Sequence, residues 1–195
     1  MDRKGLVIKE VKVEYNGLIV LEEISLRLKH GEFVTLLGKS GCGKTTLLNA
    51  IAGFVNHKGK VHKPSRLGMV FQNHAVFPWL TVRQNIGFGI GRNKERVRHY
   101  LKMTELADKE NSYPFELSGG QIQRVSLAMT LITNPELIIM DEPYSALDSH
   151  TREKMQEWLL KVWQEEKKTV LFVTHSIEEA IFLSDRIILL KDKRI

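Results

Sequence analysis

One stretch of this 195-residue chain has the residue types and spacing needed to bind a chain of phosphates. The stretch Gly38-Lys39-Ser40-Gly41-Cys42-Gly43-Lys44-Thr45 fits G-x-x-x-x-G-K-[ST], a loop that surrounds nucleotide phosphates with backbone N–H groups. Its glycines allow the backbone to approach an anion closely and to adopt positive φ. Lys44 can then reach the β- and γ-phosphates as a point charge, and the Thr45 hydroxyl can bind Mg²⁺.

The segments on either side of this loop support its assignment. Residues 33–37 form a compact apolar run that is typical of a buried strand, and residues 45–52 have the pattern of a helix that Gly53 ends. A strand, a Gly-rich loop and a helix, in this order, are the context that the motif requires. We therefore expect phosphates to bind at the N-terminus of this helix, where the helix dipole favours negative charge.

A second Gly-rich stretch, Leu117-Ser118-Gly119-Gly120-Gln121, has the spacing of a capping box and predicts another helix N-terminus. Two anion-binding loops in one chain suggest that a phosphate is held from both sides. Because the second loop has no obvious partner within the same fold, the pair of loops favours a dimer.

Hydrophobic periodicity indicates how the chain is organised. Alternation in residues 8–15 and in residues 24–28, with an Asn16-Gly17 turn between them, predicts antiparallel strands ahead of the phosphate loop. Four later strands are expected, at residues 67–71, 137–140, 169–173 and 186–190. Helices are expected after Thr81, around Val97–Leu101, after Ser118, along the stripe Met155, Trp158, Leu159, Val162 and Trp163, and after Ser176.

This order of elements predicts an α/β fold with a mostly parallel sheet. Residues 1–31 would form an antiparallel β part, residues 32–72 and 135–195 the catalytic core, and residues 73–134 a helical insertion without strands. Ligands of such sheets bind at the carboxyl ends of the strands. The side chains expected at those ends are Gly38, Gln72, Asp141, Glu142 and His175.

Composition excludes several other classes of protein. The net charge is +6, but lysines and arginines are scattered, without the basic stripe interleaved with aromatic residues that single-stranded nucleic acid would need, so we expect no nucleic-acid partner. A single cysteine excludes a disulfide framework. No apolar run approaches the roughly 20 residues of a membrane span, and we expect a soluble, cytoplasmic protein.

Taken together, these motifs resemble the ATP-binding subunits of ABC transporters across essentially the whole chain. The stretch 38–45 matches the Walker A loop, Leu117–Gln121 is the signature motif letter for letter, and Leu137–Glu142 matches Walker B with its catalytic glutamate. The resemblance implies a P-loop NTPase (RecA-like) fold with an antiparallel β subdomain and an inserted helical subdomain. It also implies ATP and Mg²⁺ as cofactors and ATP hydrolysis as the reaction.

Shorter motifs complete the resemblance. Gln72 matches the Q-loop, Ser145-Ala146-Leu147-Asp148 the D-loop, His175 the switch histidine, and Tyr15 the aromatic residue that stacks on adenine. The alternation of Tyr15 with Val11 and Val13 would also suit an ordinary packed strand. The nucleotide contacts implied are Tyr15, Gly38, Lys39, Ser40, Gly41, Cys42, Gly43, Lys44, Thr45, Thr46, Ser118, Gly119, Gly120 and Gln121.

The catalytic roles follow from the same resemblance. Asp141 would hold Mg²⁺ together with Thr45 and Gln72. Glu142 would orient and deprotonate the attacking water, a contribution of about 10²–10⁴-fold. His175 would hydrogen-bond the γ-phosphate. The expected catalytic residues are therefore Glu142, His175, Lys44 and Gln72.

The family also implies the partners. In a head-to-tail dimer, either a homodimer or a pair with a paralogous subunit, the signature helix of one protomer would face the γ-phosphate held by Lys44 of the other. A membrane permease would hold the protein at the inner face of the cell membrane, with a substrate-binding protein as an indirect partner. Phe77, Trp79 and Leu80 are candidates for the groove that binds the permease, although core packing would explain them equally well.

The stretches Phe71-Gln72, 77–82 and Leu147-Asp148 with Thr151-Arg152 resemble importers of the nitrate, sulfonate and taurine group. The cargo itself is not encoded in this subunit. The alternative is a soluble, non-transport ABC ATPase in assembly, translation or DNA maintenance. The presence of a single ATP-binding cassette, with Lys44 and Ser118 close together in the sequence, argues against this alternative. Glu142 and His175 argue against a scaffold that binds nucleotide without hydrolysing it.

Overall fold

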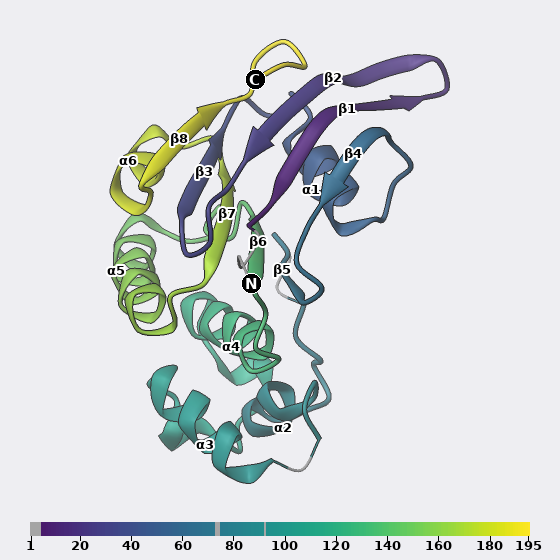
Figure 1. Ribbon diagram of the computed structural model, residues 1–195. Helices are drawn as coiled ribbons and strands as arrows, with labels where there is room; N and C mark the ends of the chain where they lie inside the picture. Colours follow the sequence, from purple (N-terminus) through teal and green to yellow (C-terminus); the bar gives the residue numbers. More distant parts are fainter. Residues whose placement is uncertain (1–4, 73–74, 92) are drawn as a thin grey trace. The chain divides into compact units, whose positions relative to one another are not determined.

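The computed structural model describes residues 5–72, 75–91 and 93–195 (Figure 1). The chain divides into two compact units. The first unit contains residues 1–67, 136–142 and 167–195, and the second contains residues 68–135 and 143–166. Two parts of the expected division lie outside the described residues. They are residues 1–4 of the antiparallel part and Asn73, where the helical insertion was expected to begin. The functional division at 1–31, 32–72 with 135–195, and 73–134 stays a prediction.

An antiparallel sheet in the first unit has the strand order β2-β1-β4 (Figure 1). Strand β1 (Val7–Tyr15) pairs with β2 (Leu18–Arg27) across a two-residue turn. Both turn residues have positive φ, 48° at Asn16 and 82° at Gly17, as a tight hairpin of right-handed twist requires. The hairpin expected from the sequence is therefore confirmed.

Strand β4 (Lys58–His62) was not expected, because its sequence Lys-Gly-Lys-Val-His has no apolar alternation. It forms by pairing with the free edge of β1, where Val61 lies opposite Ile8. Four of its five residues are exposed. Lysines on an exposed edge strand discourage pairing with another chain, which explains a strand of such polar composition.

A parallel sheet forms the core of the first unit. Its strands β6 (Leu137–Asp141), β7 (Thr169–Thr174), β3 (Phe33–Leu37) and β8 (Arg186–Leu189) lie in that order (Figure 1). Every residue of β6 and β7 is buried, as continuous apolar strands of a parallel sheet should be. Strand β5 (Leu67–Val70) spans the boundary between the two units.

Helices α1 (Lys44–Ala52) and α6 (Ile177–Leu183) belong to the first unit. Helix α1 ends at Gly53, whose φ of 90° allows its N–H to bond carbonyls of the last turn. Lys63 also donates from Nζ to the carbonyls of Ile51 and Ala52, at 2.6 and 2.8 Å. Lys63 therefore stabilises the end of this helix.

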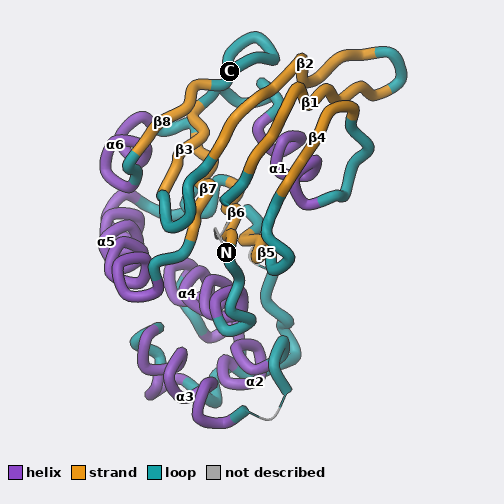
Figure 2. The backbone as a smooth tube through the Cα atoms, in the orientation of Figure 1, coloured by secondary structure: helices purple, strands orange, loops and turns teal. Residues whose placement is uncertain are grey.

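The second unit is helical, and no strand occurs in its described residues 75–91 and 93–134 (Figure 2). Its helices are α2 (Val82–Gly87), α3 (Lys94–Met103), α4 (Gly119–Leu131) and α5 (Ser149–Glu166), with 3₁₀ turns η1 (Ala107–Lys109) and η2 (Pro114–Glu116). The capping boxes expected at Thr81 and Ser118 are both formed. None of the helices in the described part of the chain is long and apolar enough to cross a membrane.

The apolar stripes expected on α3 and α5 are largely confirmed. Val97, Tyr100 and Leu101 are the buried residues of α3. On α5, Met155, Trp158, Leu159 and Val162 are buried, whereas Trp163 is only partly buried.

Candidate nucleotide-binding site

The strand register brings the chemically important residues of the first unit to one edge of the parallel sheet. Leu37 of β3 lies opposite Thr174 of β7, and Asp141 of β6 lies opposite Val173. The residues that follow these strands are Gly38, Glu142 and His175. The Gly38 N–H also donates to the Thr174 carbonyl at 3.3 Å, which ties the start of the phosphate loop to the end of β7.

Glycine is required at different positions of the phosphate loop for different structural reasons. Gly41 and Gly43 have φ of 79° and 106°, in the left-handed region that other residues rarely adopt. Gly38 needs the absence of a side chain instead, because a Cβ there would lie 2.7 Å from both Cys42 Sγ and the Leu190 carbonyl. Gly43 precedes α1 without a side-chain cap, so N–H groups of the first turn are available to an anion.

Lys44 is buried, with 4% of its side chain exposed. Its Nζ donates to the carbonyls of Gly38 at 2.7 Å and Lys39 at 2.9 Å, and lies 3.2 Å from Glu142 Oε1. A buried ammonium group is tolerated only when it is paired in this way. The loop therefore holds its cation against the carboxylate expected to be the catalytic base.

Glu142 connects Lys44 to His175. Its second carboxylate oxygen lies 2.9 Å from His175 Nδ1, and because a carboxylate can only accept, Nδ1 carries the hydrogen. The Glu142 N–H donates to the Val173 carbonyl and so continues the pairing of β6 with β7 by one residue. Its φ of 43° then ends the extended conformation of the strand. A left-handed residue other than glycine costs about 1–3 kcal/mol and often marks a functional position.

Asp141 lies at the end of β6 with 6% of its surface exposed. Burial raises the pKa of its carboxyl above the usual value; a hydrogen bond with the Thr45 side chain and the charge of Lys44 oppose this rise, while the charge of Glu142 adds to it. An oxygen pair formed by Asp141 and Thr45 has the hard donor chemistry that suits Mg²⁺.

Tyr15 lies at the end of the β1–β2 hairpin, opposite Leu18, and 44% of it is exposed. It therefore differs from Val11 and Val13, which are buried, and register shifts in β1 interrupt the alternation that relates the three residues. The ordinary packed position that the pattern also allowed is not observed for Tyr15.

A cavity of about 300 Å³ lies between the second strand of this hairpin and the phosphate loop. Its lining includes Leu18 and Val20 from β2, Gly41 and Cys42 from the loop, and Lys193. No sequence motif includes Leu18, Val20 or Lys193, and only the pairing of distant segments places them together.

The signature motif belongs to the second unit and caps α4. The Ser118 hydroxyl accepts from the Gln121 N–H at 3.4 Å, and the Gln121 side chain accepts from the Ser118 N–H at 3.0 Å. The two glycines pack closely: a Cβ on Gly119 would lie 3.2 Å from Leu147 of the D-loop, and one on Gly120 would lie 2.7 Å from Thr151. The motif is thus fitted to the D-loop and to the start of α5.

The Q-loop residue also belongs to the second unit. Gln72 lies two residues beyond β5, and its Nε2 donates to Ser145 Oγ of the D-loop at 3.3 Å. Asp148 accepts from the Thr151 N–H at 3.0 Å, and this hydrogen bond lowers the pKa of its carboxyl. The predicted site residues therefore form two groups: Lys44, Thr45, Asp141, Glu142 and His175 come together in the first unit, and Gln72 contacts the D-loop in the second.

A Gly-rich loop that ends a parallel strand and opens a helix, with its lysine buried beside the two carboxylates at the end of β6, defines a P-loop nucleotide-binding ATPase. The family profile described as ABC transporter matches residues 21–145. This chain belongs to the ABC transporter family.

Relatives and a solved structure agree with this assignment. The taurine import ATP-binding protein TauB of Escherichia coli O157:H7 is 46% identical, covering 95% of this chain and 79% of the relative. The aliphatic sulfonates import ATP-binding protein SsuB of Bacillus cereus is 44% identical, covering 89% and 74%. The structure of cbiO1 from Clostridium perfringens, part of the ABC transporter complex cbiONQ, superposes with a TM-score of 0.89 at 27% identity, covering 97% and 85%.

The protein is accordingly an ATP-binding subunit and an ATPase coupled to transport. The comparisons favour this function over that of a non-transport ABC ATPase. The expected P-loop NTPase fold is also confirmed.

Proposed function

We propose that this chain hydrolyses ATP as one half of a head-to-tail dimer and thereby drives import of a small anion or sulfonate-like solute through a membrane permease. The observation that supports it most is the line of contacts Lys44–Glu142–His175 beside the phosphate loop. The cargo class follows from similarity to relatives named for sulfonate and taurine import. Docking on the permease would place the subunit peripherally at the cytoplasmic face of the membrane.

The geometry suggests how hydrolysis proceeds. The entering triphosphate competes with Glu142 for the Lys44 ammonium, so binding releases the carboxylate from its ion pair. Glu142 then accepts a proton from the water that attacks the γ-phosphorus, the bond to the bridging oxygen breaks, and ADP leaves. His175 keeps Nε2 available for the γ-phosphate while Nδ1 remains on Glu142.

The residues expected from the sequence would hold the nucleotide and its Mg²⁺. Tyr15, opposite Leu18 in the hairpin, would stack on adenine, and Asp141, Thr45 and Gln72 would hold Mg²⁺. The ion would supply positive charge to the β- and γ-phosphate oxygens. The remaining contacts would come from the loop Gly38–Thr46 and, across the dimer, from Ser118–Gln121.

Mixing two inactive variants tests whether the sites are shared. Lys44→Met removes the cation of the phosphate loop, and Gly119→Asp places a carboxylate where the signature helix should meet the γ-phosphate; an acidic residue at a helix N-terminus is compatible with folding. Each variant alone should hydrolyse little ATP. A mixed dimer contains one intact site and one doubly impaired site, so the mixture should regain activity in a steady-state phosphate-release assay. Sites built within single protomers would give no recovery, and Gly119→Ala serves as a control for the loss of glycine.

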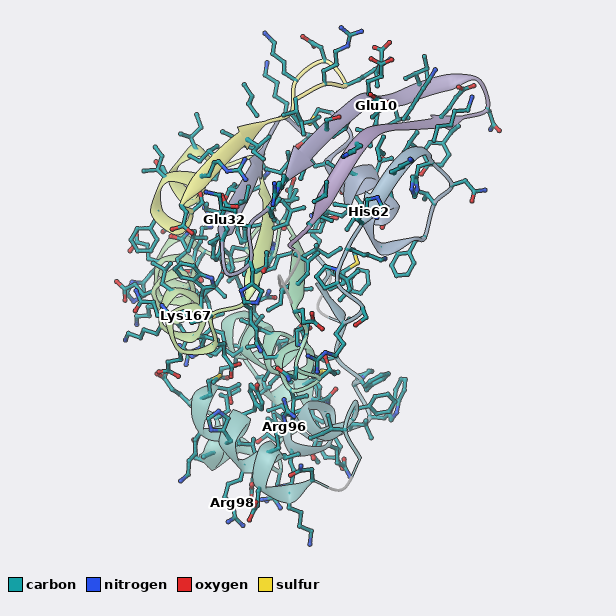
Figure 3. All side chains as sticks on the ribbon, in the orientation of Figure 1. Glu10, Glu32, His62, Arg96, Arg98 and Lys167 are labelled. Carbon is teal, nitrogen blue, oxygen red and sulfur yellow. The ribbon has the colours of Figure 1, made fainter. Side chains whose placement is uncertain are left out.

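A groove in the second unit supports the permease contact. A cavity of about 490 Å³ between α2 and α3 has an apolar lining that includes Leu80, Phe88 and Val97, with Lys94 and Arg98 among its cations (Figure 3 labels Arg98). An amphipathic helix of the permease with acidic residues beside its apolar face would fit this lining. Of the three candidates from the sequence, Leu80 lines the groove, whereas Trp79 is 69% exposed.

The wall of this groove is held in place by buried hydrogen bonds. The Asn85 side chain is fully buried and bonds the backbone of Phe77, Leu80 and Thr81. The Phe77 ring in turn packs on Phe88, with centroids 4.3 Å apart. The groove is therefore shaped before any partner binds, which lowers the entropic cost of docking.

Phe88→Glu should weaken co-purification with the permease and leave ATP binding by the isolated subunit unchanged. The side chain is 62% exposed, so the fold should tolerate the change, while an acidic group would repel the acidic helix expected in the groove. Phe115→Glu, at a position that is 80% exposed outside the groove, is the matched control. Equal recovery of the permease with both variants would contradict the assignment of this groove.

A further inference from the structure

A short relay of hydrogen bonds surrounds the turn that carries His175. The Thr174 hydroxyl donates to Glu179 Oε2 at 2.5 Å and accepts from the Ser176 N–H at 3.0 Å. Thr174 and Glu179 are buried, with 2% and 5% exposed. One hydroxyl therefore connects the residues on both sides of His175 to a carboxylate on α6.

This arrangement differs from the capping box that the sequence Ser176-Ile177-Glu178-Glu179 suggests. In a capping box the N3 carboxylate accepts directly from the N-cap N–H. Here the Ser176 hydroxyl accepts from the Glu179 N–H at 3.3 Å, but the reciprocal contact passes through the Thr174 hydroxyl. The carboxylate thus reaches the last residue of β7 as well as the start of α6.

The relay also connects to the phosphate loop. The Thr174 carbonyl accepts from the Gly38 N–H, and Thr174 pairs with Leu37 in the parallel ladder. His175 itself is 52% exposed, and its ring bonds Glu142. The position of its Nε2 therefore depends on the backbone on either side as well as on the bond to Glu142.

We infer that Glu179 and Thr174 are positioning residues that hold His175 at the distance from the phosphate loop which hydrolysis requires. The inference rests on the proposed role of His175. Neither residue would touch the nucleotide; each acts through the backbone of the turn. Loss of the Thr174 hydroxyl would leave the Ser176 N–H without its acceptor and would free the turn to move.

Thr174→Val is the sharpest test, because valine keeps the shape and the strand preference of threonine while removing its hydroxyl. We expect kcat for ATP hydrolysis to fall by about 10- to 100-fold, since a shift of about 1 Å in a reacting group can cost 100-fold, with little change in KM. Thr174→Ser, which keeps the hydroxyl, should restore most of kcat. Glu179→Leu should resemble Thr174→Val, and the exposed neighbour Glu178→Gln should behave like the parent.

The double variant Thr174→Val/His175→Ala separates positioning from general stability. If the relay acts through His175, the double variant should be no slower than His175→Ala alone. A parental kcat for Thr174→Val, or a further fall of kcat in the double variant, would overturn the inference while His175→Ala remained impaired. A parental rate for His175→Ala would instead overturn the proposed role of His175, and this inference with it.

Discussion

Glu142→Gln should bind ATP as tightly as the parent or more tightly, yet hydrolyse it about 10²–10⁴-fold more slowly, because the amide cannot take a proton from water. The amide should also bond the Lys44 ammonium less strongly than the carboxylate does at 3.2 Å, so the lysine becomes more available to phosphate. Single-turnover phosphate release and equilibrium binding of ATP would measure the two effects. With ATP retained, the variant should accumulate as a dimer in size-exclusion chromatography.

Glu136→Gln is the matched control for this change. It makes the same substitution just before β6, where the carboxylate pairs with Arg66 at 3.1 Å, far along the strand from the phosphate loop. Its rate should equal that of the parent. Hydrolysis by Glu142→Gln at the parental rate would show that another group removes the proton.

Lys44→Met should lower the affinity for ATP by at least about 100-fold. The variant loses the two charge-assisted hydrogen bonds expected between the ammonium group and the β- and γ-phosphates, which contribute about 1.5–3 kcal/mol each. Methionine keeps the buried apolar stem of the side chain, so the loop should retain its packing. Fluorescence titration with a nucleotide analogue would measure the affinity. A thermal melt on the same sample would show whether the fold is intact.

Lys63→Met controls for loss of a lysine that bonds backbone carbonyls. Its ammonium group stabilises the opposite end of α1, where it contacts Ile51 and Ala52. It should change the melting temperature more than the affinity. An unchanged affinity in Lys44→Met would mean that the ion pair with Glu142 is structural and that the phosphates bind through backbone groups alone.

Local sequence signals predicted most elements because each element carries its own pattern. The hairpin at Asn16-Gly17, the end of α1 at Gly53 and the caps at Thr81 and Ser118 follow from residues close in sequence. Strand β4 was missed for the complementary reason: its polar residues become a strand only through the partner that β1 provides.

The residue types of the nucleotide site, and therefore the family and the reaction, could be inferred from the sequence alone, since chemistry depends on which groups are present and on the spacing of short motifs. The tertiary structure decided three further features: the pairing of Lys44 with Glu142, the cavity wall that Leu18 and Lys193 add beside the loop, and the hydrogen bond between Thr174 and Glu179. These contacts join residues from separate elements. Their geometry depends on strand register and burial, which no local pattern specifies.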